Sequence, residues 1–461
     1  MTQPSVVIGR LPARSMGLKL LLVCALALLM TIPAVFVFGL LTERTHRAAD
    51  VTREVGRLMG GPQTFLGPVI AAPYQIPAAD KKQAPVEGVY VIFPARAQAS
   101  VTAASDVRKR SLFRVPVYRA DLDFDAAFDL TGVPANAPRG AVLDWSRAEF
   151  LIGVSDPRGA QSDATLSAGG RTLLLAPATT LAELSAPLGD GGEHPPASND
   201  TLKFFGASAA GIAVAGAKFD VEARLHFSGA QRVAVLAYGK TTSLQVKSDW
   251  PSPSFDGGFL PAKPRIDAHG FSASWTVPFI ARGVPAEGMP ETISRLGATS
   301  LGVSFVEPAN PYQSVARSLK YALLFVGLVF LAYFLFETTT GKRVHPAQYV
   351  LLGLAQIIFY LLLLSIAEQV GFDWAFLLAA CATVGLISVY AGWVFESRRQ
   401  GMIALVAFGL LYALIYVLMR LEDLALLVGA VASFAAISAV MYFTRRIDWY
   451  GARDTPAEGG T

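Results

Sequence analysis

The feature that most constrains this chain is a long uncharged apolar run in its last third. Residues 345–372 read HPAQYVLLGLAQIIFYLLLLSIAEQVGF, and no charged side chain occurs from residue 347 to residue 367. A helix rises 1.5 Å per residue, so about 20 such residues cross the hydrocarbon core of a bilayer. A buried helix of a soluble protein is the alternative, and similar runs elsewhere in the chain argue against it. The run therefore predicts a membrane protein.

Apolar runs of spanning length recur, and we expect six transmembrane helices. Charged residues make up only 16% of the chain, against about a quarter in soluble domains, which fits a chain partly embedded in a membrane. The first run is followed by Thr-Glu-Arg-Thr-His-Arg and not by a small-residue cleavage site, so an uncleaved anchor is favoured over a signal peptide. The predicted helices are residues 20–41, 319–337, 348–367, 374–395, 402–419 and 424–443.

The charges between these runs predict that both termini, residues 1–19 and 444–461, lie in the cytoplasm. Basic residues gather in the short loops that this orientation places inside: Lys342, Arg343, Arg398, Arg399, Arg445 and Arg446. Acidic residues dominate the loops that it places outside, where Arg420 is the one cation: Glu368, Asp373, Glu422 and Asp423. This is the positive-inside pattern. Arg317 and Lys320 do not fit it, but they border a long domain, where the rule is weak. Residues 42–318 are therefore expected outside.

Residues 42–318 have the composition of a folded β-rich domain. A polar segment at 43–59 is expected to be helical, and GGPQTFLGPVIAAPY at 60–74 ends it. Apolar and polar residues then alternate at 121–130, 243–250 and 270–279, as in half-buried strands. The predicted fold is an α + β membrane protein with six transmembrane helices and a large external antiparallel β-sandwich-like domain between the first two. The domain is one unit or two, with 187–200 as a loop or boundary.

Several stretches together resemble the CreD family of bacterial inner-membrane proteins, along nearly the whole chain. In the membrane part they are residues 305–337, 345–372, 421–429 and 440–450; in the β domain they are 60–74, 153–159, 248–261 and 270–275. The motif positions are His345, Pro346, Gln348, Tyr349, Glu368, Arg445, Asp448, Trp449 and Tyr450. The resemblance implies a multi-pass protein of the bacterial inner membrane, with residues 42–318 in the periplasm. It also implies a part in cell-envelope integrity under stress, and it supplies no catalytic residue.

The residues themselves favour no catalytic, metal or cofactor site. Ser155 lacks the second glycine of a Gly-x-Ser-x-Gly elbow, and we expect it to end a strand in a turn. The aspartates at 121, 123, 125 and 129 alternate along a strand about 7 Å apart, too far to close around calcium, so they indicate a solvated strand face. The net charge of +4 comes without a Lys/Arg block, which argues against nucleic acid as a partner.

Polar residues inside the apolar runs are the remaining candidates for function. Gln356 and Tyr360 lie one turn apart, and Tyr412, Tyr416 and Arg420 form a second stripe at every fourth residue. Glu422 and Asp423, just beyond this stripe, are further candidates. No ionisable group lies near the centre of the last five runs, as transport of ions would require. We expect these side chains to bond neighbouring helices rather than to line a path. Arg445 with Trp449 and Tyr450 is expected to anchor the tail at lipid headgroups; docking of a partner is the alternative.

The sequence leaves several classes of function open. The favoured hypothesis is a non-enzymatic envelope protein whose periplasmic β domain senses, binds or scaffolds an envelope partner, with the lipid bilayer and an unidentified periplasmic or envelope protein as partners. The first alternative is a membrane-protein insertase or chaperone of YidC-like layout, although residues 321–336 lack the intramembrane arginine of that family. A small-solute transporter and an intramembrane enzyme are further alternatives; no polar residues converge at one depth to support the enzyme.

Overall fold

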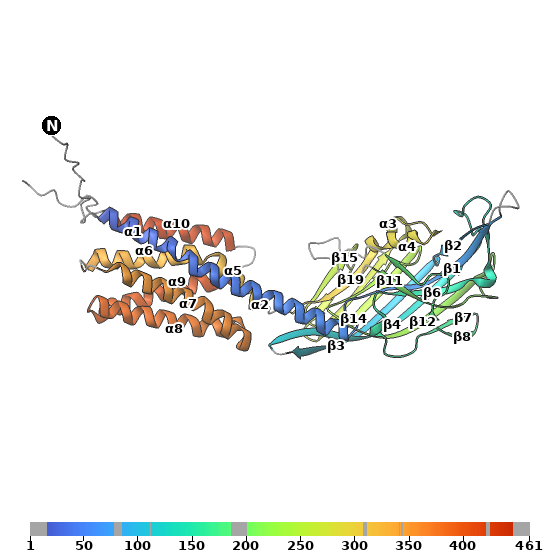
Figure 1. Ribbon diagram of the computed structural model, residues 1–461, viewed down its shortest axis with the longest axis horizontal. Coiled ribbons are helices and arrows are strands. Elements are labelled where there is room, and N and C mark those ends of the chain that lie inside the picture. The colour runs from blue at the N-terminus through green and yellow to red at the C-terminus, as the bar shows by residue number, and fades with distance from the viewer. Residues whose placement is uncertain are drawn as a thin grey trace, which may run out of the picture. The chain divides into compact units, whose positions relative to one another are not determined.

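The computed structural model describes residues 16–77, 85–110, 112–185, 201–307, 311–340, 342, 344–420 and 425–445. It contains two compact units (Figure 1). The helical unit comprises Met1–Arg47 and Ala309–Thr461, and the β unit comprises Ala48–Pro308. The β-rich region thus forms one unit, which settles one of the alternatives left open by the sequence.

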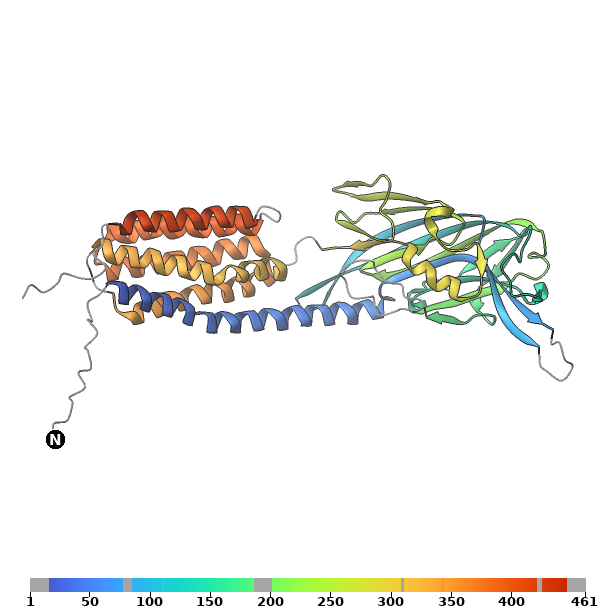
Figure 2. The same ribbon diagram turned by 90° about the horizontal axis from the view of Figure 1, so that it is seen from above.

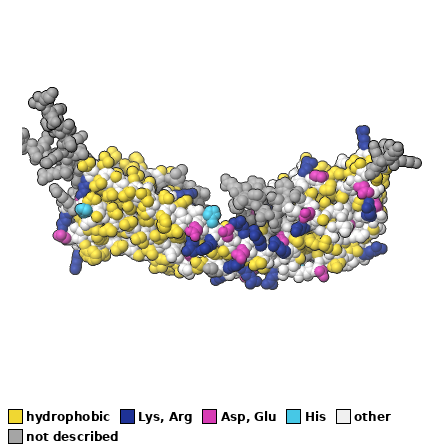
Figure 3. Space-filling model, viewed as in Figure 1, with side chains coloured by type: hydrophobic (Ala, Val, Ile, Leu, Met, Phe, Trp, Pro, Cys, Tyr) yellow, Lys and Arg dark blue, Asp and Glu magenta, His cyan; other side chains and the backbone are white. Residues whose placement is uncertain are grey.

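The helical unit is built from long helices that lie side by side (Figure 2). Their bounds are α1 Met16–Leu29, α2 Thr31–Leu58, α5 Pro311–Lys320, α6 Ala322–Thr340, α7 Pro346–Val370, α8 Phe372–Val394, α9 Arg398–Arg420 and α10 Ala425–Thr444. Among the described residues, five segments are long and apolar enough to cross a membrane: Gly17–Leu58, Ala322–Thr340, Pro346–Val370, Phe372–Val394 and Arg398–Arg420. Hydrophobic side chains cover the visible face of this unit (Figure 3). The sixth predicted span falls on α10, and the count of six stays a prediction.

Local chemistry explains where the first two helices break and end. Pro33 has no N–H to donate to the carbonyl one turn earlier, so the helix is interrupted at Met30. The Thr31 hydroxyl donates to the Leu28 carbonyl at 2.7 Å and satisfies one group near the break. Helix α2 then runs to Leu58, so the helical interpretation of the polar segment is confirmed. Gly60 and Gly61, both at positive φ, end it.

Aromatic rings join four of the long helices. Tyr412 of α9 packs edge-on against Phe325 of α6, with ring centroids 4.8 Å apart, and against Phe359 of α7, at 5.0 Å. Phe359 in turn packs edge-on against Phe376 of α8 at 5.5 Å. Aromatic packing therefore holds α6, α7, α8 and α9 together, because each ring buries a large apolar area.

The β unit contains two sheets. The eleven-stranded sheet has the order β10-β11-β6-β1-β13-β19-β15, with β2, β5, β9 and β18 paired beside this path; the eight-stranded sheet has the order β16-β17-β14-β3-β4-β12-β7-β8. The strands of the first are β1 Gln63–Ile76, β2 Val86–Ile92, β5 Val142–Leu143, β6 Glu149–Val154, β9 Ala176–Pro177, β10 Glu183–Ser185, β11 Thr201–Ser208, β13 Arg232–Leu236, β15 Pro253–Gly257, β18 Glu287–Gly288 and β19 Ser300–Phe305. The strands of the second are β3 Arg96–Arg110, β4 Phe113–Asp129, β7 Thr165–Ala168, β8 Arg171–Leu174, β12 Lys218–Ala230, β14 Thr241–Ser248, β16 Arg265–Asp267 and β17 Gly270–Val277. Short helices connect them: η1 Trp145–Arg147, η2 Pro157–Gly159, α3 Phe279–Arg282, α4 Glu291–Ser294 and η3 Arg295–Thr299.

Both sheets contribute to one buried core. Phe65 of β1 packs edge-on against Phe227 of β12, with centroids 5.2 Å apart, and Phe124 of β4 packs against Tyr238 at 5.7 Å. The alternation seen in the sequence explains this arrangement, because the apolar positions of β4 are buried while its aspartates face outward.

Two ladders differ from the predicted antiparallel pairing. Strands β1 and β13 pair in parallel, and so do β3 and β14, while all other described ladders are antiparallel. Parallel partners need long connections, and more than a hundred residues separate the strands in each pair. Alternation within a strand does not reveal the direction of its partner, so these two ladders could not be predicted from the residue pattern. The predicted loop at 187–200 lies outside the described residues.

Candidate functional site

The motif at residues 345–349 begins helix α7, and four of its side chains have identifiable roles. His345 is the N-cap, and its Nδ1 accepts a hydrogen bond from the Ala347 N–H at 3.2 Å. Gln348 reaches back so that its Oε1 accepts from the His345 N–H at 3.0 Å, which completes a capping box. Pro346 occupies the first helical position, where its missing N–H costs nothing. Three of these residues therefore define the start of α7.

Tyr349, the fourth, belongs to a buried ionic cluster that we call the Glu337 cluster: Lys19, Glu337, Val344 and Tyr349. The Tyr349 hydroxyl donates to Glu337 Oε2 at 2.9 Å, and the Val344 N–H donates to Oε1 at 2.9 Å. The Lys19 ammonium forms an ion pair with the same carboxylate and donates to the Val344 carbonyl at 3.0 Å. Glu337 is only 3% exposed, so its charge is stabilised by these donors and not by water.

The Glu337 cluster joins α1, α6 and α7 at one end of the helical unit. Sequence reasoning singled out Tyr349 but not the other members. A signal existed, because Lys19 and Glu337 flank apolar runs at ends that the charge pattern assigns to the same side of the membrane. Their direct contact could not be read from the sequence, since 318 positions separate them.

Glu368, a predicted motif residue, makes a second cross-helix contact near the end of α7. It accepts a hydrogen bond from the Tyr312 hydroxyl of α5 at 3.1 Å, and Arg44 Nε of α2 lies 3.9 Å from the same oxygen. Burial raises the pKa of the Tyr312 hydroxyl, and the nearby Glu368 charge raises it further. The phenol therefore stays protonated and donates, and Glu368 connects α7 with α2 and α5.

Two of the predicted stripe residues form a third contact, between α8 and α9. Arg420 Nη2 lies 2.5 Å from Asp373 Oδ2, and the Tyr416 hydroxyl donates to Asp373 Oδ1 at 3.1 Å. More than half of each charged side chain is exposed, so this pair contributes less to stability than the Glu337 cluster. Glu422 and Asp423 lie outside the described residues.

The remaining predicted polar residues, Gln356, Tyr360 and Tyr412, are buried in the interior of the helical unit. Their exposed fractions are 0%, 1% and 2%. The Gln356 amide and the Tyr360 hydroxyl have no hydrogen-bond partner among the described residues, and the Tyr412 hydroxyl lies near Thr383 without good hydrogen-bond geometry. The interhelical hydrogen bonds that we expected for them are thus not formed there.

The C-terminal motif is described only as far as Arg445. The Arg445 guanidinium lies over the ring of Tyr442, 4.2 Å from its centroid, and both side chains are exposed. Asp448, Trp449 and Tyr450 lie outside the described residues, so the proposed anchor at lipid headgroups stays a prediction.

In the β unit, two motifs of the sequence meet in one buried hydrogen-bond network. Ser155 Oγ accepts from the Thr64 N–H at 2.9 Å and lies 3.2 Å from Gln63 Oε1. Gln63 Nε2 donates to the carbonyls of Gly60 and Asp156, both at 2.8 Å. Asp156 caps the short helix η2. The interpretation of Ser155 as a turn residue after a strand is confirmed, and its hydroxyl contacts no histidine among these partners.

The aspartate row of β4 pairs with neighbouring strands one residue at a time. Asp121 lies 2.6 Å from His226 Nδ1, and Asp129 lies 2.8 Å from the Lys218 ammonium, whose hydrogen bond lowers the pKa of Asp129. These contacts follow the strand and do not converge, as expected for a solvated strand face. In the described part of the chain, no group of three His, Cys, Asp or Glu side chains could hold a metal ion.

The described polar clusters suit helix assembly better than chemistry. The three acidic side chains of the helical unit that carry them, Glu337, Glu368 and Asp373, lie near helix ends and each contacts a basic side chain. Their described contacts join helices to one another.

Comparison with known proteins agrees with this membrane architecture. The family model described as "Inner membrane protein CreD" matches residues 15–450. The inner membrane protein CreD of Escherichia coli (strain K12) is 30% identical to this chain over 432 residues, which cover 92% of this chain and 91% of that relative. The family resemblance noted in the sequence is confirmed. The chain therefore belongs to the CreD family of inner membrane proteins.

Proposed function

We propose that this protein maintains cell-envelope integrity under stress without catalysing a reaction. In this proposal the helical unit spans the inner membrane six times with both termini in the cytoplasm. The β unit lies in the periplasm, where it senses, binds or scaffolds an envelope partner. The part in envelope integrity is what the family resemblance implies for this chain.

The observation that carries the proposal is how the ionisable groups of the helical unit are used. Glu337, Glu368 and Asp373 each bind side chains of other helices, and all three lie near helix ends. A transporter of ions or protons keeps ionisable groups at membrane depth along a path. These groups instead hold helices together, which favours a membrane platform over a conducting or catalytic device.

The β unit offers exposed apolar side chains on which a partner could dock, along β16 and β17 at one edge of the eight-stranded sheet. We call this set the β17 surface: Leu260, Ile266, Phe279 and Ile280. Ile266 lies on β16 opposite Phe271, the Ala262 N–H donates to the Ser274 carbonyl at 2.9 Å, and α3 begins directly after β17. The four side chains are 75%, 53%, 47% and 92% exposed, in that order. Phe279 and Ile280 are neighbours on α3, whereas Ile266 lies beside the opposite end of β17, so these exposed apolar side chains form a row along the strand. We infer that this row is where a partner docks.

Entry of a normally excluded dye into cells that lack this chain tests the proposal. The knockout is complemented with the full chain, or with residues 42–312 exported alone. We expect the full chain to restore dye exclusion. Restoration by the exported domain would indicate that the helices mainly anchor it, whereas a requirement for the full chain would indicate that the helical unit also acts in the membrane. A knockout that admits no more dye than wild type contradicts the envelope role.

A matched pair of surface substitutions tests the docking surface in the full chain. Ile280→Ser removes the most exposed apolar side chain of the β17 surface. Leu174→Ser makes the same kind of change on β8, at the opposite edge of the same sheet, where Leu174 is 63% exposed. We expect only Ile280→Ser to impair dye exclusion at equal protein levels. Equal behaviour of the two variants would argue against the β17 surface.

A further inference from the structure

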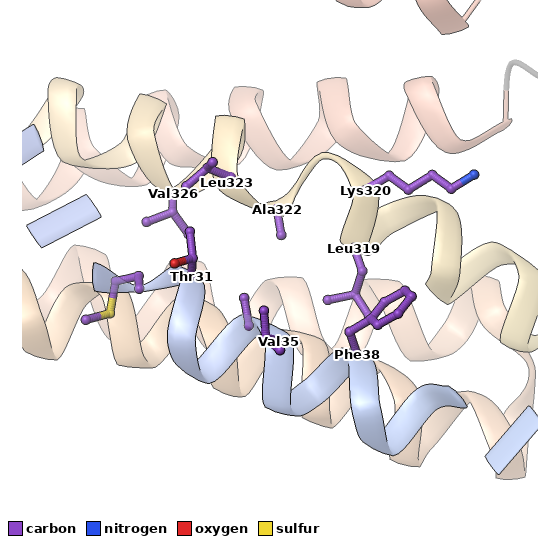
Figure 4. A pocket seen from close by; sticks show the side chains of 10 residues that line it. Thr31, Val35, Phe38, Leu319, Lys320, Ala322, Leu323 and Val326 are labelled. Atoms are coloured by element: carbon purple, nitrogen blue, oxygen red, sulfur yellow. The ribbon is translucent and has the colours of Figure 1, made fainter. Parts of the chain in front are cut away.

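The helical unit contains a groove between the α1–α2 break and the α5–α6 junction. Its volume is about 220 Å³, and its walls are mostly apolar (Figure 4). Two alanines, Ala34 and Ala322, line it, and their small side chains leave space that larger residues would fill. Val35 and Phe38 are 69% and 52% exposed, so the groove opens to the surroundings of the helices.

The one hydroxyl among the lining side chains, that of Thr31, already donates a hydrogen bond to the backbone of its own chain. Thr31 Oγ1 donates to the Leu28 carbonyl at 2.7 Å, which leaves it poorly placed to bind a polar ligand. The occupant that such walls favour is therefore a hydrocarbon. From Thr31 to Phe38 the groove follows seven helical residues, or about 10 Å. This is comparable with half the hydrocarbon thickness of a bilayer, about 15 Å.

A cation lies at one end of the groove. Lys320 is beside Leu319 and Phe38, whereas Thr31 and Val326 lie at the other end (Figure 4). Lys320 ends α5, two residues before the first residue of the apolar helix α6, so its ammonium is expected at the depth of lipid headgroups. Within the part of the chain that the structure describes, no carboxylate pairs with Lys320, whereas Lys19, Arg44 and Arg420 all have acidic partners.

We propose that this groove binds one anionic phospholipid. An acyl chain lies along Ala34, Val35 and Ala322, and the Lys320 ammonium pairs with the lipid phosphate. The charge sits at the end where a headgroup would be, and the apolar walls continue from it toward the middle of the membrane. Lys320 departs from the positive-inside pattern, and binding a lipid phosphate would give it a function at that position.

Native mass spectrometry of the purified full chain tests the site. The detergent-solubilised protein is titrated with phosphatidylglycerol or with phosphatidylcholine of the same acyl chains, and retained lipid is counted. We expect phosphatidylglycerol to be retained roughly fivefold better, the factor that one basic side chain contributes on an anionic lipid surface. Lys320→Gln should abolish the preference, and Arg399→Gln, at the first turn of α9, should preserve it.

Filling the groove separates a specific site from ordinary surrounding lipid. Ala322→Phe should reduce retention of both lipids, whereas Leu410→Phe, at an exposed position of α9, should not. If Ala322→Phe aggregates on size-exclusion chromatography, Val35→Trp fills the groove from the α2 side. Equal retention of the two lipids by wild type, a preference that survives Lys320→Gln, or unchanged retention in the filled variants would each overturn the proposal. The proposal would also be overturned if the wild-type protein formed a dimer that the filled variants did not form, because a second copy of the chain would then cover the groove.

Discussion

At the scale of single residues, burial decides which of the helical unit's ionic contacts matter for stability. Glu337 is 3% exposed and binds Lys19, Val344 and Tyr349, whereas the Asp373–Arg420 pair is largely in contact with solvent. Removing one partner of a buried pair leaves the other uncompensated, which typically costs about 3–5 kcal/mol. An exposed pair contributes about 0–1 kcal/mol. These residues therefore offer a matched comparison.

We expect Glu337→Gln to lower the stability of the helical unit by about 3 kcal/mol, because Lys19, whose side chain is 24% exposed, then faces a neutral amide in a partly buried setting. Asp373→Asn should lower it by less than about 1 kcal/mol. Thermal unfolding in detergent, followed by intrinsic fluorescence, measures both. The triple variant Lys19→Met/Glu337→Leu/Tyr349→Phe should recover part of the loss, since neither charge remains and only the Val344 N–H is left without its acceptor. Similar losses in the two single variants would contradict the role assigned to the Glu337 cluster.

Gln356 gives the opposite expectation. Its amide is fully buried and has no hydrogen-bond partner among the described residues, so Gln356→Leu removes an unsatisfied group that costs about 1–3 kcal/mol. We expect equal or higher thermal stability and normal dye exclusion. Tyr360→Phe, which removes a hydroxyl in the same situation, is the matched control and should behave alike. Loss of dye exclusion at normal protein level would instead favour activity within the membrane, as in the insertase, transporter or enzyme alternatives.

At the scale of elements, the start of α7 shows how a short motif defines a helix. His345 and Gln348 form a reciprocal capping box around Pro346. The double variant His345→Ala/Gln348→Ala should lower the stability of the helical unit by about 1–2 kcal/mol and speed hydrogen exchange in the first turn of α7, because two backbone N–H groups lose their acceptors. Exchange mass spectrometry measures this effect. His269→Ala, at an exposed turn of the β unit, should leave α7 unchanged. Unaltered exchange at residues 345 and 347 in the double variant would exclude the cap.

The elements also show what could be predicted from the sequence and what could not. Apolar runs give the long helices, and period-two alternation gives strands such as β4, because both patterns reflect burial within a single segment. The parallel ladders β1–β13 and β3–β14 depend on partners far along the chain, and so does the Glu337 cluster. Six of the candidate polar residues form hydrogen bonds or ion pairs with other helices or cap a helix: His345, Gln348, Tyr349, Glu368, Tyr416 and Arg420. Gln356 and Tyr360 do not, because the polarity of a buried side chain does not reveal whether its neighbours can bond it.

At the scale of the whole molecule, the two units pair the N–H and C=O groups of their backbones in different ways. Helices bond within one segment, and so they suit a bilayer, where no water replaces a missing partner. The β unit pairs strands from distant parts of the chain around an aromatic core of its own. The chain therefore divides into a part built for lipid and a part built for water, which is the physical basis for expecting the β unit on one side of the membrane.

The charge pattern turns this division into a prediction of topology. Reporter fusions after residues 200, 341, 370, 398, 422 and 450 should report outside, inside, outside, inside, outside and inside, because basic loops are retained in the cytoplasm. The fusions after 422 and 450 are the most informative pair, since they flank α10. Opposite results for them would make α10 a sixth span, and identical results would reduce the count to five and place the C-terminal tail outside. A cytoplasmic result at 200 would refute the periplasmic placement of the β unit and, with it, the proposal that this unit meets an envelope partner.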